Sequence, residues 1–223
     1  MTLDGRVEEA QSVIADVFRE NNGLACVTCS FQAECMAIVD LVVAQQPGIP
    51  VLFLETGYHF PETYTYRDEM TAKLHLNVVN LSSKMTVPEQ EAKFGILYQS
   101  APDRCCGMRK VEPLFAGLDP FAVWFTALRR EQSPTRANLQ PIDHFKLPTG
   151  KQLLKVSPLA AWTNKDVWAY LKQRGIPVLP LYEQGYTSIG CAPCTSLPLD
   201  PENLRSGRWS GHKLECGIHI QSE

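Results

Sequence analysis

The first 175 residues alternate between helical and extended patterns, and this alternation limits the possible folds more than any other feature. Three short apolar runs have the length of buried strands and lie at 24–30, 50–55 and 76–79. Helical spacing of apolar residues precedes and separates these runs, at 7–18, 33–46 and 61–75. Strands that alternate with helices build parallel βαβ units, whose ligands bind beyond the carboxyl ends of the strands. We therefore predict an α/β fold around a parallel sheet.

The alternation continues beyond residue 100. We predict a helix over 105–116, a strand over 121–128, a loop over 129–140 and an extended run over 153–159. A final helix is predicted from Thr163 to Gly175. Thr163 suits its N-cap, Asp166 its capping-box position and Gly175 its C-cap.

Regular patterns fade after residue 175, where the chain becomes rich in Pro and Gly and still holds three of its eight cysteines. We expect one domain in two parts. An α/β part spans 1–175, and a C-terminal cysteine-containing lobe with a mobile tail spans 176–223. An irregular segment of this kind is expected to need a metal or a ligand for its order.

The charge balance gives little attraction to nucleic acid or to an anionic membrane, because the formal net charge is only -3. No run of 18 apolar residues occurs, and the first twenty residues are too charged for a secretory signal. We therefore expect a cytoplasmic protein that binds no nucleic acid and no membrane. Any anion site has to come from local clusters of Arg and Lys.

Four of the cysteines form two close groups. Cys105 and Cys106 are adjacent in "RCCGMRK", and Cys191 and Cys194 form a C-x-x-C in "GCAPC". In a reducing compartment, such spacing favours an iron–sulfur or zinc site over a disulfide framework. The alternative is a redox dithiol with two buried cysteines. Adjacent cysteines are awkward for zinc, whereas in a cubane cluster neighbouring thiolates bind different irons.

Two further features suggest an anionic ligand. "CSFQAE" (29–34) follows a predicted strand and opens a helix, so its backbone N–H groups offer partial positive charge, although many such turns bind nothing. It lacks the glycines and lysine of a triphosphate loop. Basic residues also gather in three loops, and the alternative is that they are merely solvated. They are Arg104, Arg109, Lys110, Arg129, Arg130, Arg136, Arg205 and Arg208.

Cys216 stands alone in "ECGIH", three residues before His219. A lone cysteine near a terminus is commonly an incidental thiol. Next to Arg and Lys, however, its pKa would fall and its thiolate would become a usable nucleophile. The residues alone leave both interpretations open.

Taken together, "CC" at 105–106, "GCAPCT", "ETGYHFPETY", "RREQSPTRA" and "ECGIH" resemble the assimilatory adenylyl-sulfate reductases, the [4Fe-4S] branch of the sulfonucleotide reductases. The resemblance extends from about Cys26 to Ile220. It implies a Rossmann-like, adenine nucleotide α-hydrolase-like fold with a twisted parallel sheet and helices on both faces. It also implies that adenosine 5'-phosphosulfate (APS) and a dithiol, thioredoxin or a similar protein, yield sulfite, AMP and a disulfide.

The resemblance assigns a role to each matching residue. Cys216 would be the nucleophile, forming an S-sulfocysteine that thioredoxin cleaves. One [4Fe-4S] cluster per chain, which does not shuttle electrons, would be held by Cys105, Cys106, Cys191 and Cys194. Lys110 would link it electrostatically to the substrate. The substrate-binding set would be Ser30, Phe31, Ala33, Glu34, Thr56, Gly57, Lys110, Arg136, Arg205, Arg208 and His219.

Some positions depart from the family pattern. Glu55 stands where an aspartate is usual, and an aspartate is also commoner at the end of the 30–35 turn, so side-chain roles there are open. Cys26, Cys29 and Cys35 match no family site, and we interpret them as buried thiols. The oligomeric state is not determined by the sequence, and a homo-oligomer remains open.

The nearest alternative is a reductase of the 3'-phosphorylated nucleotide, or an enzyme that uses both substrates. That branch shares "ECGIH" but lacks the four cluster cysteines. An ATP pyrophosphatase of the same fold would need a Ser-Gly-Gly turn, which "CSFQAE" is not. A third alternative is a nucleotide-sensing or zinc-binding module without catalytic activity.

Overall fold

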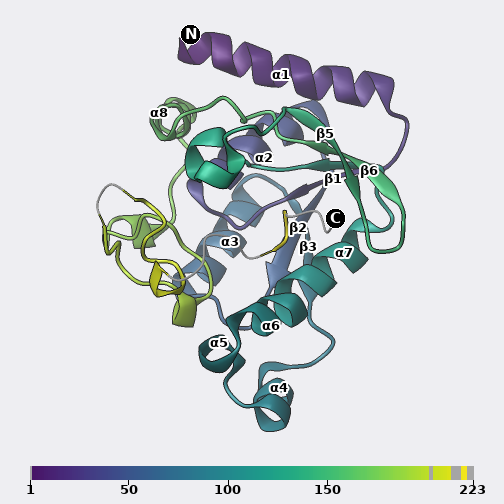
Figure 1. The fold of residues 1–223 in the computed structure, drawn as a ribbon. Helices are drawn as coiled ribbons and strands as arrows, with labels where there is room; N and C mark the ends of the chain where they lie inside the picture. The colour runs from purple at the N-terminus through teal and green to yellow at the C-terminus, as the bar shows by residue number, and fades with distance from the viewer. Residues whose placement is uncertain (1, 201–202, 212–216, 220–223) are drawn as a thin grey trace.

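A six-stranded sheet forms the centre of the molecule (Figure 1). The computed structural model describes residues 2–200, 203–211 and 217–219. In spatial order the strands are β3 (Asn77–Ser82), β2 (Pro50–Glu55), β1 (Ala25–Thr28), β4 (Val123–Phe125), β6 (Gln152–Val156) and β5 (Ile142–Lys146). Neighbouring strands are parallel except for β6 and β5, which are antiparallel. The predicted α/β fold with a mainly parallel sheet is confirmed.

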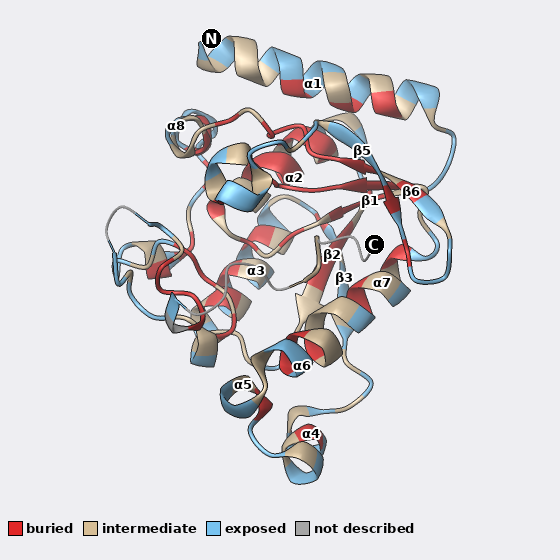
Figure 2. Ribbon diagram, in the orientation of Figure 1, coloured by how far each residue is buried: buried red, intermediate tan, exposed pale blue. Residues whose placement is uncertain are grey.

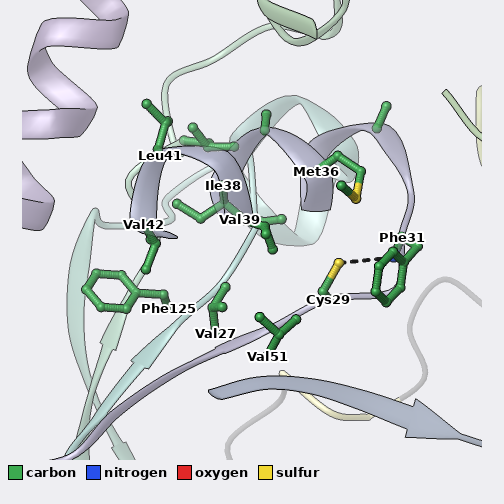
Figure 3. Packing of buried hydrophobic residues seen from close by; sticks show 14 of the residues in the cluster. Val27, Cys29, Phe31, Met36, Ile38, Val39, Leu41, Val42, Val51 and Phe125 are labelled. Atoms are coloured by element: carbon green, nitrogen blue, oxygen red, sulfur yellow. Dashed lines mark hydrogen bonds between the residues drawn. The ribbon is translucent and has the colours of Figure 1, made fainter. Parts of the chain in front are cut away.

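Both faces of the sheet are covered by helices (Figures 1 and 2). On one face, the main core takes buried side chains from four helices: α1 (Leu3–Glu20), α2 (Ala33–Gln45), α3 (Pro61–Lys73) and α8 (Asn164–Arg174). The other face packs against α7 (Glu112–Leu118) through Leu114 and Leu118. Since successive strand residues point to opposite faces, Val27 and Phe125 enter the first core (Figure 3), whereas Cys26 and Trp124 enter the second.

The strand order creates a crevice between β1 and β4. The chain proceeds from β1 to β2 and β3 on one side, whereas β4 and β6 lie on the other side. At such a switch point, the loops that leave the carboxyl ends of the two strands diverge and open a space for a ligand. The crevice is therefore bordered by the residues that follow Thr28 and Phe125.

The predicted ends of α8 are confirmed. Thr163 Oγ1 accepts a hydrogen bond from Asp166 N at 3.1 Å, and Asp166 Oδ2 accepts one from Thr163 N at 2.7 Å. Gly175 ends the helix in the left-handed conformation. Each partner satisfies a backbone group that the helix itself leaves unpaired.

The helix predicted over 105–116 is interrupted in a way that the sequence analysis missed. An α-helical turn, α6 (Pro102–Cys106), passes into a π-helical segment at Gly107–Val111 before α7 begins. Pro113 has no N–H to donate to the carbonyl four residues earlier, and its ring would crowd that carbonyl. The wider π turn relieves this conflict and carries Arg109 and Lys110.

Several smaller elements were also not predicted. These are β5 and the helices α4 (Val87–Phe94) and α5 (Leu97–Ser100). In β5 only Phe145 is buried, so the strand shows no apolar alternation. Beyond α8 the chain forms short 3-10 turns, and Leu179, Leu181 and Ile189 of this lobe lie in the main core. Among the described residues, no helix is long and apolar enough to cross a membrane.

Candidate functional site

A cavity of about 180 Å³ opens at the crevice between β1 and β4; we call it the switch-point cavity. Its floor is apolar and includes Leu52, Phe53 and Leu54 of β2. Of the predicted substrate residues, it is lined by Ser30, Glu34, Thr56, Lys110, Arg136, Arg205, Arg208 and His219. Segments far apart in the sequence therefore meet around one hollow, as the parallel-sheet prediction required.

Four basic side chains line the switch-point cavity, and they come from separate segments. Lys110 lies in the π-helical turn, Arg136 in the loop after β4, and Arg205 and Arg208 in the C-terminal lobe. Among the described residues that line the cavity, these four basic side chains are accompanied by one acidic side chain, that of Glu34. Such an arrangement favours an anionic ligand, because guanidinium groups hold phosphate or sulfate oxygens with two hydrogen bonds at once.

The other predicted basic residues have structural contacts instead. Arg129 pairs with Glu131 at 3.1 Å, Arg130 donates to the carbonyl of Leu139, and the Arg104 guanidinium lies over the Phe94 ring. Arg109 is buried and donates to the Thr56 and Met85 carbonyls and to Gln90 Oε1. The sequence pattern correctly indicated a basic cluster but did not separate ligand-facing from structural residues.

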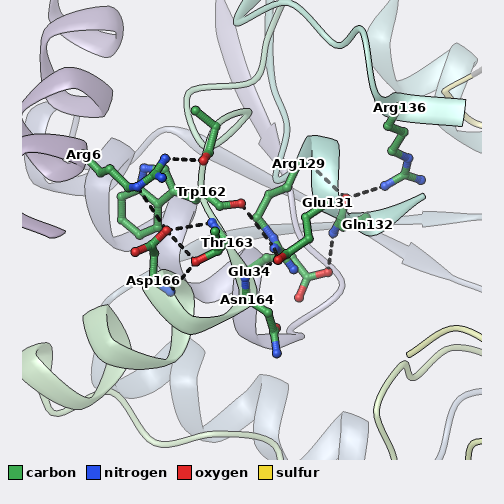
Figure 4. Close-up of polar contacts among 11 residues, drawn as sticks. Arg6, Glu34, Arg129, Glu131, Gln132, Arg136, Trp162, Thr163, Asn164 and Asp166 are labelled. Carbon is green, nitrogen blue, oxygen red and sulfur yellow. Dashed lines mark hydrogen bonds and ion pairs between the residues drawn. The ribbon is translucent and has the colours of Figure 1, made fainter. Parts of the chain in front are cut away.

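Arg136 is positioned through a hydrogen-bonded chain (Figure 4). It donates to Gln132 Oε1, and Gln132 Nε2 donates to Glu34 Oε1 at 2.7 Å. Gln132 Oε1 also accepts from the backbone N–H of Arg129 at 3.0 Å. The loop after β4 is thereby linked to the first turn of α2 across the mouth of the crevice. Gln132 was not predicted from the sequence, because its neutral side chain carries no signal of a binding role.

The turn after β1 is held by Gln32. Its Nε2 donates to Ser30 Oγ at 3.0 Å, and its Oε1 accepts from the backbone N–H of Ile189 at 2.8 Å. Phe31 adopts a positive φ of 58°. Because Phe31 turns its ring into the main core, the Ser30 hydroxyl remains on the cavity side.

Phe31, Ala33 and Gly57 do not line the switch-point cavity in the described structure. Phe31 contacts Phe53 and Tyr66, and the Ala33 N–H donates to Tyr182 Oη at 3.1 Å. Gly57 has a φ of 72°, and a Cβ there would lie 2.7 Å from Val87 Cγ2. These residues shape the two turns rather than face the hollow.

Arg208 reaches the cavity across a glycine. Its guanidinium atoms would lie 2.1 Å from a Cβ placed on Gly190, a distance that no side chain can accept. Arg208 is buried, and its guanidinium lies 4.6 Å from the centre of the Trp209 ring. Gly190 therefore keeps open the space that Arg208 occupies.

Replacing this glycine tests that arrangement. We expect Gly190→Ala to displace the Arg208 guanidinium and to weaken the binding of an anion in this cavity about tenfold, the loss of one charge-assisted contact. Gly107→Ala is the matched control, since Gly107 adjoins Cys106 but has open space around it. Isothermal titration with inorganic phosphate gives the comparison. Equal affinities for the two variants would show that Gly190 does not serve Arg208.

His219 is built into the cavity wall. Its ring stacks on Trp124, with centroids 5.3 Å apart and planes at 17°, and its carbonyl accepts from Lys155 Nζ at 3.3 Å. Burial, followed by the nearby Lys155, Arg136 and Arg205, holds the pKa of His219 well below its ordinary value. Nδ1 is buried, and no described residue forms a hydrogen bond with it. A neutral imidazole thus borders the hollow.

The nucleophile predicted from the sequence, Cys216, lies outside the described residues. Gly217, the next residue in the sequence, has a φ of 91°. A Cβ placed on it would lie 3.5 Å from Val111 Cγ2, an ordinary contact distance. Ile218 packs against the second core and also lines the switch-point cavity. The described segment Gly217–His219 is therefore packed into the fold at the site.

The other four predicted cysteines meet at a second, smaller hollow, the cysteine cavity. Cys105, Cys106, Cys191 and Cys194 all line it, and so do Tyr58, Tyr98 and Lys110. Cys191 Sγ lies 3.4 Å from Thr56 Oγ1. Lys110 lines both cavities. Thr56 lines the switch-point cavity and contacts Cys191 of the cysteine cavity, so the two sites adjoin.

The thiols of the cysteine cavity differ in acidity. Burial opposes ionisation of Cys191, but Lys110, Thr56 and Arg208 hold its pKa below the ordinary value. Burial, together with Cys191, raises the pKa of Cys194 to about 11. Among the described residues, no group of three or more His, Cys, Asp or Glu is arranged to hold a single metal ion. Four cysteine side chains that converge beside a lysine fit a larger anionic centre, such as a tetrathiolate cluster.

Three cysteines outside this group were interpreted as buried thiols. Cys26 and Cys29 are buried. Cys35 is half-buried, and both Cys29 and Cys35 line the switch-point cavity. The interpretation as a buried thiol therefore holds for Cys26 and Cys29 but not for Cys35, which is partly exposed.

Comparisons of this chain with known proteins all point to the same family of proteins. Residues 25–197 match the phosphoadenosine phosphosulfate reductase domain. The chain is 42% identical to the adenosine 5'-phosphosulfate reductase of Geobacillus kaustophilus (97% of this chain, 92% of that protein). It is 45% identical to that of Streptomyces coelicolor (87% and 81%). A phosphoadenosine 5'-phosphosulfate reductase of Gloeobacter violaceus is 39% identical (94% and 88%).

Solved structures show the same fold. A phosphoadenylyl-sulfate reductase from Candida auris superposes with a TM-score of 0.71 at 23% identity, over 87% of this chain and 96% of that chain. A Candida glabrata FMN adenylyltransferase superposes with a TM-score of 0.63 at 16% identity, over 85% and 62%. The second likeness confirms the adenine nucleotide α-hydrolase-like fold.

Proposed function

Since the chain belongs to the phosphoadenosine phosphosulfate reductase domain family, we propose that it is an adenosine 5'-phosphosulfate reductase that uses a dithiol protein as reductant. The observation that carries the proposal is the switch-point cavity, where an apolar floor adjoins four basic side chains and a neutral histidine. An adenine ring fits the apolar side. The phosphosulfate fits the basic side.

The proposed reaction proceeds in two displacements at sulfur. The Cys216 thiolate attacks the sulfate sulfur; an S–S bond forms, the S–O bond to the phosphate breaks, and AMP leaves with the electron pair. A thiolate of thioredoxin or a similar dithiol protein then attacks Cys216 Sγ and expels sulfite. Its second thiol closes the disulfide and releases Cys216. The dithiol is oxidised by two electrons, and the sulfur is reduced by two.

The residues of the switch-point cavity have separate roles in this proposal. Lys110, Arg136, Arg205 and Arg208 would neutralise the phosphosulfate and stabilise the leaving AMP. His219, whose pKa lies well below its ordinary value because of burial and the nearby cations, would offer an N–H to the same oxygens. Ser30, Glu34 and the Thr56 turn would hold the nucleoside. The backbone shape set by Phe31, Ala33 and Gly57 would support these contacts.

We propose that Cys105, Cys106, Cys191 and Cys194 hold one [4Fe-4S] cluster, which places the chain in the cluster-containing branch. Their convergence in one cavity beside Lys110 supports this assignment. When bound, the cluster would supply fixed negative charge next to Lys110 rather than electrons. Lys110, which lines both cavities, would then connect cluster and substrate electrostatically.

One turnover in the absence of reductant tests the function. Protein purified without oxygen and mixed with APS is expected to release one AMP per chain and to gain the mass of one SO₃ group on the peptide that contains Cys216. Thioredoxin should then release sulfite and restore the original mass. AMP release without any protein-bound SO₃ would contradict the proposed intermediate.

Arg208 gives a test of the basic cluster. We expect Arg208→Ala to weaken APS binding by about 1.5 to 3 kcal/mol, the range of a hydrogen bond to a charged group. Arg104→Ala is a matched control, since Arg104 lies over Phe94 and does not line the cavity. Equilibrium binding of APS to both variants distinguishes them. An unchanged dissociation constant for Arg208→Ala would remove this residue from the substrate site.

A further inference from the structure

Cys29 and Cys35 form a second pair of thiols in the wall of the switch-point cavity, separate from the four cysteines of the cysteine cavity. Cys29 follows β1, and Cys35 lies in the first turn of α2. The two thiols lie close enough to influence each other's ionisation, and both contact the turn that joins them. We propose that this pair is an oxidisable dithiol that hydrogen peroxide converts into a disulfide, and that this disulfide weakens nucleotide binding.

The surroundings give the two sulfurs different roles. Cys35 Sγ lies 3.3 Å from Ser30 Oγ, and its pKa is below the ordinary value, chiefly through the neighbouring Cys29 thiol. Cys29 Sγ accepts from the backbone N–H of Phe31 at 3.2 Å (Figure 3), and burial raises its pKa. Cys35 is also the more exposed of the two. Cys35 is therefore the sulfur that attacks the peroxide, and Cys29 is the sulfur that then attacks the oxidised Cys35 to form the disulfide.

The oxidation balances with one molecule of peroxide. The Cys35 thiolate attacks one peroxide oxygen; an S–O bond forms, the O–O bond breaks, and the departing hydroxide takes up a proton as water. Cys29 sulfur then attacks Cys35 sulfur; the S–S bond forms and the S–O bond breaks. The released hydroxide takes the Cys29 proton as a second water. The two thiols lose two electrons in total, and peroxide gains them.

The disulfide would act on the nucleotide through Ser30. In the reduced protein, the Ser30 hydroxyl contacts Cys35 and accepts from Gln32, and Gln32 in turn holds the backbone of Ile189. Bonding Cys35 to Cys29 breaks the contact between Ser30 and Cys35 and pulls the start of α2 toward β1. The expected loss of nucleotide affinity rests on the proposed function, whereas the formation of the disulfide does not depend on it.

The sequence allows a direct test by peptide mapping. A protease that cuts after glutamate separates the peptides 21–34 and 35–55, so that Cys29 and Cys35 lie on different fragments. After peroxide treatment of the complete protein and alkylation of the remaining thiols, we expect these fragments to stay joined until a reductant is added. AMP present during the treatment should slow the joining. Cys26 shares the first fragment, but its side chain is in the core of the opposite face, so Cys26→Ala should still give the joined pair.

AMP affinity is measured on the same samples before and after peroxide. For the wild type we expect about tenfold weaker binding after oxidation, equivalent to one lost hydrogen bond, and recovery with dithiothreitol. Cys29→Ser keeps Cys26 on the first fragment and Cys35 on the second, and it should give no joined fragments. Neither Cys29→Ser nor Cys35→Ser should lose affinity on treatment, and Cys35→Ser provides the affinity control if the buried Cys29 variant does not fold. Separate fragments after peroxide, joined fragments in Cys29→Ser, or an unchanged AMP affinity would each overturn the proposal. Failure of the reduced wild type to bind AMP would instead contradict the proposed function.

Discussion

Cys216→Ser is expected to abolish sulfite formation while leaving nucleotide binding intact. A serine hydroxyl is not ionised at neutral pH and is a poor nucleophile toward sulfur, so the first displacement cannot proceed. Loss of the nucleophile should lower turnover by about 10⁴-fold or more. Steady-state sulfite release with APS and thioredoxin measures the change, and AMP titration measures binding.

Two controls make this result specific. Cys26→Ser removes a thiol that is buried in the second core and lines neither cavity, and it should keep wild-type turnover per folded molecule. The iron content of Cys216→Ser should equal that of the wild type, because Cys216 is not among the four proposed ligands. Sulfite release by Cys216→Ser at the wild-type rate would mean that another group attacks the substrate.

Cys191→Ser should have the second largest effect, through loss of the cluster. Its thiol is the most acidic of the proposed ligands with a resolved pKa shift, since Lys110, Thr56 and Arg208 counter the effect of burial. A hydroxyl binds iron more weakly than a thiolate does. We expect most of the iron and acid-labile sulfide to be lost, together with a lower melting temperature. Iron and sulfide analysis of protein purified without oxygen provides the measurement.

Cys26→Ser again serves as the matched control and should retain iron and sulfide. A colourless wild-type protein with one zinc per chain would refute the cluster assignment. A Cys191→Ser variant with full iron content would exclude Cys191 from the ligand set.

The sequence was most informative where periodicity and caps act locally. The strands β1, β2 and β3, the helices α1, α2 and α3, and the capped ends of α8 follow from apolar spacing and single capping residues. Sheet order was not contained in that spacing. The antiparallel β5 escaped prediction because only Phe145 of that strand is buried. The π-helical turn escaped because Pro113 lies inside an otherwise helical pattern.

For the site, the sequence identified the side chains with strong chemistry and missed those that position them. Lys110, Arg136, Arg205, Arg208 and His219 were all predicted, and all line the switch-point cavity. Residues such as Gln132 and Trp124 act through contacts that depend on the folded chain, so no local pattern marks them. The division of the basic residues into ligand-facing and structural groups likewise depends on tertiary neighbours.

Sulfite release from each of the two sulfonucleotides distinguishes an adenosine 5'-phosphosulfate reductase from the alternatives. With thioredoxin as reductant, we expect sulfite and AMP in equal amounts from adenosine 5'-phosphosulfate, at a kcat/KM well above that for the 3'-phosphorylated nucleotide. Preference for the 3'-phosphorylated substrate would favour the alternative reductase, and comparable rates would favour a dual-substrate enzyme. No sulfite from either nucleotide, in protein that carries its iron and binds AMP, would contradict the account.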